Sequence, residues 1–129
     1  MKLVTICIPT FNQSKSLKKL LNQVSKYNPS YPIIISDNGS KDNTHEVVNS
    51  FKKKLKNLEY LRLRRNFGFD YNYLKCVKKV KTTYFWTIGS DDQIYKHSLK
   101  YIEKLIKNLN YPNGVTFVDK KKILKNDMK

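Results

Sequence analysis

Two adjacent carboxylates, Asp91 and Asp92, follow an apolar segment at residues 84–88. Neighbouring carboxylates repel each other unless a proton or a cation lies between them. Because no pair of His or Cys lies nearby, these hard oxygen donors favour Mg²⁺ or Mn²⁺, which one or two carboxylates bind together with the phosphate oxygens of a substrate. Gly89 allows a turn in which the two side chains converge. The same pair is also typical of a solvated surface turn, so by itself it leaves both interpretations open.

A second polar turn begins at Asp37 and continues through Asn38, Gly39 and Ser40. Its carboxylate can accept hydrogen bonds from the N–H of a nucleobase or from a sugar hydroxyl. An Asp-Asn-Gly turn is also an ordinary connection into a helix. The chain has neither a G-x-G-x-x-G fingerprint nor a P-loop motif, so a phosphate-bearing ligand would depend on a metal and on carboxylates.

The elements that must position these residues alternate in hydrophobic period along the chain. Short apolar segments rich in β-branched residues predict strands at residues 3–8, 33–35, 60–63, 84–88 and 114–118. Apolar residues three or four positions apart predict helices between them. The inward-facing residues of these helices are Leu17, Leu20, Leu21, Val24 and Tyr27; Val47, Val48, Phe51 and Leu55; Leu74, Val77 and Val80; and Leu99, Ile102, Leu105, Ile106 and Leu109. Asp42 or Asn43 is expected to cap the second helix.

This alternation predicts an α/β domain with a largely parallel sheet covered by helices on both faces. In such sheets ligands bind beyond the carboxyl ends of the strands. The segments that follow the first four strands, at residues 9–12, 36–40, 64–68 and 89–93, are all polar or contain glycine. We therefore expect the functional site to be formed by these loops.

Four segments together resemble, in order and spacing, the family 2 glycosyltransferases of the GT-A type. They are I-C-I-P-T-F-N at residues 6–12, S-D-N-G-S-K-D at 36–42, N-F-G-F-D-Y-N at 66–72, and the segment at 84–92 that ends in the two aspartates. Their family counterparts are the I-P-T-[YF]-N opening, the D-[DN]-G-S-x-D turn, the N-x-G stretch and the acidic D-x-D region. The resemblance covers about residues 3–118 and implies a GT-A, Rossmann-like fold.

The resemblance also implies a site for a nucleotide-diphosphate sugar, with a UDP-sugar as the expected donor. The implied donor-binding residues are Pro9, Thr10, Asn12, Asp37, Asn66, Gly68 and Asp91, of which Pro9, Thr10 and Asp37 would hold the base and ribose. Asp91 and Asp92 are the implied catalytic residues, with Asp92 as the ligand of Mn²⁺ or Mg²⁺. Most family members invert configuration: an acceptor hydroxyl attacks the anomeric carbon, and the metal neutralises the charge that develops on the departing diphosphate.

The chain departs from the family pattern in two ways. Ser90 replaces the first acid of the D-x-D triplet, which leaves one acidic pair. The family's acceptor half, which supplies the general base, lies beyond the resembling segments, and Asp119 and Asp127 match no motif, so we assign no general base. We expect residues 1–119 to form the donor-binding domain and residues 120–129 to be a basic tail or the start of the acceptor region. The implied acceptor is a polysaccharide or a lipid-linked glycan.

The net charge of +16 calls for a separate explanation. Only three of the 26 Lys and Arg residues are arginines, and alanine is absent, a composition that an AT-rich genome produces without selection for polyanion binding. Because arginine is the usual side chain for bidentate recognition of bases and phosphates, we expect no nucleic-acid partner. Two other hypotheses remain open at this point: a truncated nucleotide-binding remnant without activity, and a basic α/β protein that binds nucleic acid.

The expected location is the cytoplasm. The apolar run at the amino terminus breaks at Pro9, and no segment approaches the roughly 18 apolar residues of a membrane span. Cys7 and Cys76 fit buried reduced thiols. Because the implied acceptors lie at a membrane, a basic face could give peripheral contact with its inner surface.

Overall fold

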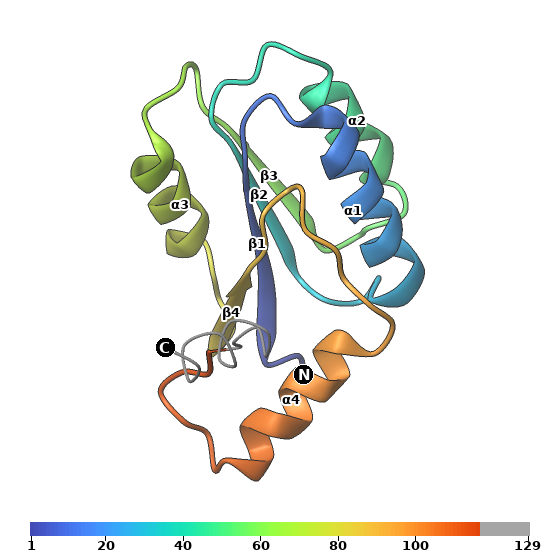
Figure 1. Cartoon of the computed structure of the whole chain (residues 1–129), viewed down its shortest axis with the longest axis vertical. Helices are drawn as coiled ribbons and strands as arrows, with labels where there is room; N and C mark the ends of the chain where they lie inside the picture. Colours follow the sequence, from blue (N-terminus) through green and yellow to red (C-terminus); the bar gives the residue numbers. More distant parts are fainter. Residues whose placement is uncertain (117–129) are drawn as a thin grey trace, which may run out of the picture.

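A parallel sheet of four strands forms the centre of the molecule (Figure 1). In the computed structural model, which describes residues 1–116, the strands are β1 (Val4–Thr10), β2 (Ile33–Asp37), β3 (Leu58–Arg62) and β4 (Tyr84–Thr87). Their order across the sheet is β3-β2-β1-β4, and every neighbouring pair is parallel. The carboxyl ends of the strands therefore meet at one edge of the sheet, as the sequence predicted.

The first strand is longer than expected. β1 continues through Pro9 to Thr10, whereas the apolar run predicted an end at Ile8. Proline has no N–H to donate to a neighbouring strand. Pairing with β4 ends at Cys7, whose carbonyl accepts a hydrogen bond from the N–H of Ile88 at 2.9 Å. Pro9 lies past that point, so its missing N–H removes no hydrogen bond to β4.

Helices cover both faces of the sheet, which confirms the predicted fold class. α1 (Ser14–Tyr27), α2 (Thr44–Phe51) and α4 (Ser98–Asn108) pack on one face, and α3 (Phe69–Lys78) lies alone on the other (Figure 1). The larger core lies on the first face and is made of buried aliphatic and aromatic side chains: Val4, Ile6, Ile8, Leu17, Leu20, Leu21, Val24, Tyr31, Ile33, Ile35, Val48, Phe51, Leu55, Ile88, Ile94, Leu99, Ile102 and Ile106.

The third helix turns a different side to the sheet from the one that its apolar residues predicted. Leu74, expected on the inner face, is 53% exposed, and Val77 is half-buried. The residues that face the sheet are Asn72 and Cys76, which lie about one helical turn apart and are both buried. Both donate hydrogen bonds to backbone carbonyls of β2. These polar contacts fix the rotation of α3, so the expectation for Leu74 is wrong.

The last described helix, α4, packs on the larger core through Leu99, Ile102 and Ile106. Leu109, expected on the same face, is 52% exposed because the helix ends at Asn108. Residues 114–116 of the strand expected at 114–118 have no regular secondary structure. The remainder of that strand and the tail expected at residues 120–129 lie outside the described residues. No helix within residues 1–116 combines the length and the apolar character needed to cross a membrane.

Candidate functional site

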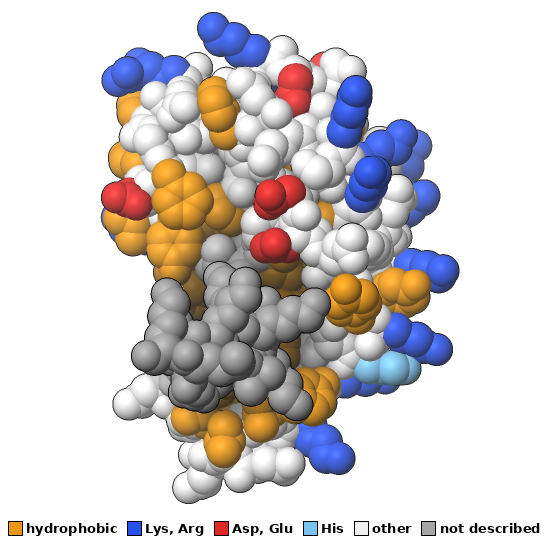
Figure 2. All heavy atoms as spheres, in the orientation of Figure 1, with side chains coloured by type: hydrophobic (Ala, Val, Ile, Leu, Met, Phe, Trp, Pro, Cys, Tyr) orange, Lys and Arg blue, Asp and Glu red, His pale blue; other side chains and the backbone are white. Residues whose placement is uncertain are grey.

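A cavity of about 480 Å³ opens at the carboxyl edge of the sheet. Residues from the ends of β1 and β4, from the loops after all four strands and from the start of α3 line it: Pro9, Thr10, Phe11, Gln13, Asn38, Asn66, Gly68, Phe69, Asn72, Thr87, Gly89, Ser90 and Asp91. Five of the seven expected donor-binding residues are among them, and Asn12 and Asp37 are not. Figure 2 shows acidic side chains near the middle of one face beside exposed apolar side chains, with many Lys and Arg nearer its rim.

Thr10, at the end of β1, lines this cavity and carries a hydroxyl without a hydrogen-bond partner in the described part of the chain. Thr10 is 3% exposed, and its carbonyl accepts a hydrogen bond from the N–H of Asn38 at 2.9 Å. Its hydroxyl oxygen Oγ1 is buried and has no hydrogen-bond partner among the described residues. A buried polar group without a partner costs roughly 1–3 kcal/mol. A ligand that places a polar group beside Thr10 would remove this penalty.

Asn38 organises the loop that follows β3. This residue is 4% exposed, and its Nδ2 donates hydrogen bonds to Oδ1 of Asn66 at 2.9 Å and to the carbonyl of Gly68 at 3.2 Å. Its Oδ1 accepts the N–H of Phe67 at 2.9 Å. Gly68 has a φ of +91°, a conformation that is strained for other residues. The buried amide of Asn38 therefore holds Asn66 and Gly68 at the cavity, a role that the sequence did not predict.

Asn72 lines the cavity from α3. Its Nδ2 donates hydrogen bonds to the carbonyls of Ser36 at 2.9 Å and Thr10 at 3.4 Å, and its Oδ1 accepts the hydroxyl of Ser36 at 2.6 Å. One amide thus ties α3 to both central strands directly at the site. The sequence carried one signal for this role: a polar residue one helical turn before a cysteine, in a segment that belongs to the family resemblance.

Asp91 and Asp92 lie in a tight turn after β4, and both side chains are exposed. The N–H of Asp92 donates to the carbonyl of Gly89 at 3.0 Å, and the N–H of Gly89 donates to Oδ2 of Asp92 at 2.8 Å. A Cβ atom placed on Gly89 would lie 2.9 Å from Oδ1 of Asp91 and 3.0 Å from Oδ2 of Asp92. The two carboxylates therefore converge over Gly89, and the missing side chain leaves room for both.

This pair of carboxylates fits a hard divalent cation. Mg²⁺ is typically held by one or two carboxylates, with waters and substrate phosphates as its other ligands. No group of three or more His, Cys, Asp and Glu side chains comes together within residues 1–116, so two carboxylates are the donor set available there. A second hollow of about 360 Å³ shares Asp91 with the main cavity and is also lined by Asp92. Asp91 therefore borders both hollows.

Ser90 occupies the position of the first acid in the family's D-x-D triplet. It is 1% exposed, and its hydroxyl donates a hydrogen bond to Oε1 of Gln13. Both residues line the cavity. Ser90 therefore links the acidic turn to the segment between β1 and α1, and Gln13 is a cavity residue that the sequence did not predict.

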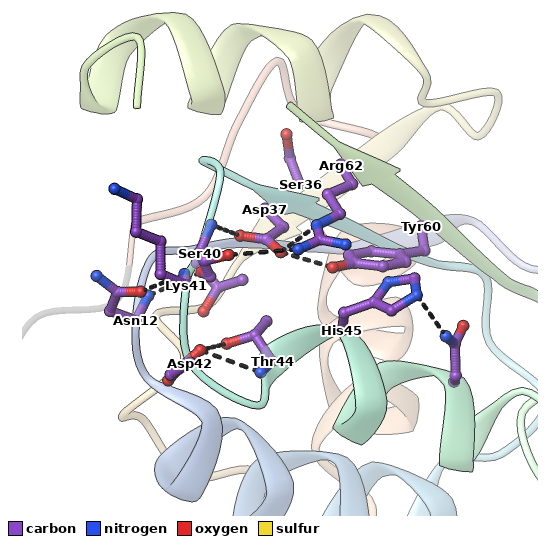
Figure 3. Close-up of polar contacts among 12 residues, drawn as sticks. Asn12, Ser36, Asp37, Ser40, Lys41, Asp42, Thr44, His45, Tyr60 and Arg62 are labelled. Atoms are coloured by element: carbon purple, nitrogen blue, oxygen red, sulfur yellow. Dashed lines mark hydrogen bonds and ion pairs between the residues drawn. The ribbon is translucent and has the colours of Figure 1, made fainter. Parts of the chain in front are cut away.

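Asp37 is fully buried and does not line the cavity. Its Oδ1 accepts the N–H of Ser40 at 2.9 Å, and its Oδ2 accepts the hydroxyl of Tyr60 at 2.5 Å, with Nε of Arg62 at 4.0 Å (Figure 3). Burial, together with the neighbouring Asp37 carboxylate, raises the pKa of Tyr60, so the phenol remains a donor. Both carboxylate oxygens thus have donors inside the protein. Asp37 therefore shapes the loop after β2, and its expected contact with a base or ribose stays a prediction.

Asn12 also lies outside the cavity and contacts the same loop. Its N–H donates to Oγ of Ser40 at 2.8 Å, and its Oδ1 accepts the N–H of Lys41 at 2.9 Å (Figure 3). Its φ of +49° lies in the left-handed region, which Asn adopts more readily than most residues. Asn12 therefore helps to position the loop after β2, and its expected contact with the donor stays a prediction.

Asp42 joins the beginnings of two helices. Its Oδ2 accepts the N–H of Ser14 at 3.0 Å, and its Oδ1 accepts the N–H and the hydroxyl of Thr44 at 3.0 and 2.5 Å (Figure 3). Of the two residues expected to cap α2, Asn43 makes no side-chain cap bond. Partial burial opposes a charge on Asp42, but the hydrogen bonds from Thr44 and Ser14 outweigh it and hold its pKa below the ordinary value.

Sequence comparison supplies a family and a relative. The family described as Glycosyl transferase family 2 matches residues 5–126. The chain is 36% identical over 105 residues to abequosyltransferase RfbV of Salmonella typhimurium, a match that covers 78% of this chain and 32% of RfbV. The chain thus spans about a third of the length of this relative.

Two solved structures share the fold. TarS of Staphylococcus aureus, in complex with UDP-GlcNAc, matches with a TM-score of 0.76 and 28% identity, over 84% of this chain and 32% of that structure. The mannosyltransferase PcManGT of Pyrobaculum calidifontis, in complex with GDP-Man and Mn²⁺, matches with a TM-score of 0.72 over 81% of this chain and 32% of that structure. At 14% identity, the second match shows a common fold alone.

Proposed function

The chain belongs to glycosyl transferase family 2, and we propose that its cavity binds the nucleotide-diphosphate sugar from which such an enzyme transfers the sugar to an acceptor hydroxyl. We propose a UDP-sugar as the donor, because TarS, at 28% identity, is known in complex with UDP-GlcNAc. Since the chain spans about a third of its relative RfbV, donor binding is the part of the reaction that we assign to the described residues.

The observation that carries this proposal is the meeting of separate strand-end loops at one cavity. Five residues line the same space: Pro9 and Thr10 at the end of β1, Asn66 and Gly68 in the loop after β3, and Asp91 in the turn after β4. The carboxyl edge of an open parallel sheet is where ligands bind in this class of fold. The unpartnered hydroxyl of Thr10 adds a polar group that a bound ligand would satisfy.

We propose that Thr10 and Asp91 hold the polar groups of the nucleoside. The Thr10 hydroxyl can donate to or accept from a base or ribose group. The Asp91 carboxylate can accept a hydrogen bond from a ribose hydroxyl. Phe11 and Phe69, which are 40% and 66% exposed and line the cavity, offer apolar surfaces for the base and the sugar ring.

We propose that Asp92, with Asp91 beside it, holds Mn²⁺ or Mg²⁺. When bound, the ion supplies a Lewis acid that neutralises negative charge on the departing diphosphate. The chain's own contribution is the turn in which Gly89 binds Oδ2 of Asp92 and leaves room for both carboxylates. Two carboxylates alone would repel a diphosphate, so we expect donor binding to depend on the cation.

The proposed reaction is a direct displacement with inversion at the anomeric carbon. The acceptor oxygen forms a bond to that carbon as its bond to the diphosphate breaks, and the acceptor's proton passes to a general base. Asp91 is the only carboxylate among the described residues that line the cavity, and we assign it to the donor, so we name no general base among these residues.

The acceptor we propose is a polysaccharide or a lipid-linked glycan at the cytoplasmic face of a membrane, where the net charge of +16 favours anionic lipid.

Calorimetric titration with UDP, in the presence of Mn²⁺ and then of EDTA, tests the donor site. We expect binding with Mn²⁺, at least about tenfold weaker binding in EDTA, and a similar loss in Asp92→Asn. Asp70→Asn is the matched control, because Asp70 is an exposed carboxylate on α3 outside the cavity. Equal affinity of Asp92→Asn and Asp70→Asn would contradict the metal assignment. Release of UDP from UDP-GlcNAc then separates an active chain from a binding remnant.

A further inference from the structure

Another polar pocket, distinct from the two hollows beside Asp91, lies at the opposite end of the sheet from the donor cavity. It has a volume of about 260 Å³ and lies between Lys2 in the segment before β1, the end of α1 and the beginning of α4. Lys2, Lys26, Lys96 and Lys100 line it, together with His97. In Figure 1 these segments meet near the amino terminus, on the side of the sheet away from the strand-end loops.

The lining of this pocket is strongly positive. None of the described residues that line it is acidic, and none of its four lysines forms an ion pair with a carboxylate within residues 1–116. The carboxylate of Glu103 contacts the lining residue Tyr31. Its two oxygens are occupied by the N–H of Leu3 at 2.7 Å and the hydroxyl of Tyr31 at 3.0 Å. Like charges gathered in this way repel one another, and a bound anion would relieve that repulsion.

A residue in the lining of this pocket carries a buried donor that has no partner in the described part of the chain. Asn28, which lines the pocket, is 2% exposed, and its Nδ2 has no hydrogen-bond partner among the described residues. Its backbone is already fixed, because its N–H donates to the carbonyl of Val24 at 2.8 Å. The side-chain amide nitrogen thus has an unused donor, and leaving it unpaired is costly.

The beginning of α4 adds to the positive potential. The helix starts at Ser98 without a side-chain cap hydrogen bond and with no acidic residue in its first turn. His97 and Lys100, on either side of that start, both line the pocket. The free N–H groups and the dipole of a helix favour an anion at its amino end.

We propose that this pocket is a binding site for a phosphate group, separate from the donor cavity and independent of the function proposed above. Nδ2 of Asn28 donates a hydrogen bond to a phosphate oxygen, and the lysine ammonium groups neutralise its charge. The volume is sufficient for one phosphate with a few waters. The phosphate can belong to a small soluble ester or to the headgroup of an anionic lipid, and both present the same chemistry to these residues.

Titration with inorganic phosphate in EDTA, followed by amide chemical shifts, tests the soluble form while the donor site is without metal. We expect shifts centred on residues 26–31 and 96–100. The triple variant Lys2→Gln, Lys96→Gln, Lys100→Gln should bind phosphate at least about tenfold more weakly. The control Lys19→Gln, Lys53→Gln, Lys56→Gln makes the same charge change at exposed lysines outside the pocket and should stay within about twofold of the parent.

Asn28→Asp tests the geometry, because it keeps the shape of the side chain and replaces its donor with a carboxylate. We expect this variant to lose phosphate binding. Sedimentation with phosphatidylcholine vesicles that contain phosphatidylglycerol tests the lipid form, and there the pocket triple variant should bind less than the control triple. Loss in either assay that is confined to the pocket variants supports the site and identifies the source. Equal loss in the two triple variants, or unchanged binding of both probes by Asn28→Asp, would overturn it.

Discussion

The side-chain amide of Asn38 donates a hydrogen bond to Oδ1 of Asn66 at 2.9 Å and thereby joins the loop after β2 to the loop after β3. Both residues line the cavity, and Asn38 also accepts the N–H of Phe67. One buried side chain therefore fixes the loop after β3 against the loop after β2.

Replacing Asn38 by alanine should weaken both stability and donor binding. The change leaves the N–H of Phe67 without its partner and takes one of two donors from Oδ1 of Asn66, which together cost roughly 1–3 kcal/mol of unfolding free energy. We expect about tenfold weaker binding of UDP, since Asn66 and Gly68 lose their support. Urea unfolding and calorimetry measure the two effects. Asn22→Ala, at an exposed position of α1, is the control, and equal effects of the two changes would argue against this role for Asn38.

Gly89→Ala should impair metal-dependent binding without unfolding the protein. The added Cβ would lie 2.9 and 3.0 Å from the two carboxylate oxygens, so Asp91 and Asp92 must move apart. Both are exposed, and we expect a change in melting temperature of no more than about 3 °C, with at least fivefold weaker Mn²⁺-dependent UDP binding. Gly114→Ala, where a Cβ meets no atom within 4 Å, is the matched control. Unchanged affinity of Gly89→Ala for UDP in the presence of Mn²⁺ would mean that binding does not require the carboxylates of Asp91 and Asp92 to converge.

Two substitutions on α3 test which side of the helix faces the sheet. Asn72→Leu removes three hydrogen bonds to β1 and β2 and places an apolar side chain against their carbonyls, so a loss of roughly 2–4 kcal/mol is expected. Leu74→Asn changes a residue that is 53% exposed and should alter the unfolding free energy by less than about 0.5 kcal/mol. Chemical denaturation measures the unfolding free energy of both variants. A larger loss in Leu74→Asn than in Asn72→Leu would indicate that the face predicted from the apolar residues packs on the sheet.

These α3 residues also show where reading the sequence succeeds and fails. The strand and helix order followed from hydrophobic period, because β1, β2, α1 and α4 each bury a regular set of apolar side chains. The apolar residues of α3 did not predict its buried face, because the amide of Asn72 and the thiol of Cys76 make its contact with the sheet.

The candidate site was predictable at the level of loops and less so at the level of single residues. Motif spacing located Thr10, Asn66 and Asp91 in segments that meet at the cavity. It could not tell that the carboxylate of Asp37 is consumed by Ser40 and Tyr60, because that depends on which donors lie across the fold. A side chain that positions another side chain leaves no recognisable pattern in the sequence around it.

The stability of the protein should fall at acid pH through Asp42. Its pKa is lowered in the folded state by hydrogen bonds from Thr44 and Ser14, which outweigh partial burial. The stabilisation is therefore complete above the unfolded pKa of about 3.9 and is lost as the pH falls through the lower folded value. The difference in unfolding free energy between the parent and Asp42→Asn should be constant from about pH 7 to 5 and shrink below about pH 4. A difference that grows on acidification would contradict the direction of this pKa change.

A crystal structure of the chain with UDP and Mn²⁺, with the metal located by anomalous scattering, tests the central claim most directly. We predict a manganese peak at the carboxylates of Asp91 and Asp92, and the nucleotide in the cavity with a polar atom on the hydroxyl of Thr10. A nucleotide bound elsewhere on the chain, or a metal remote from both carboxylates, would contradict the account.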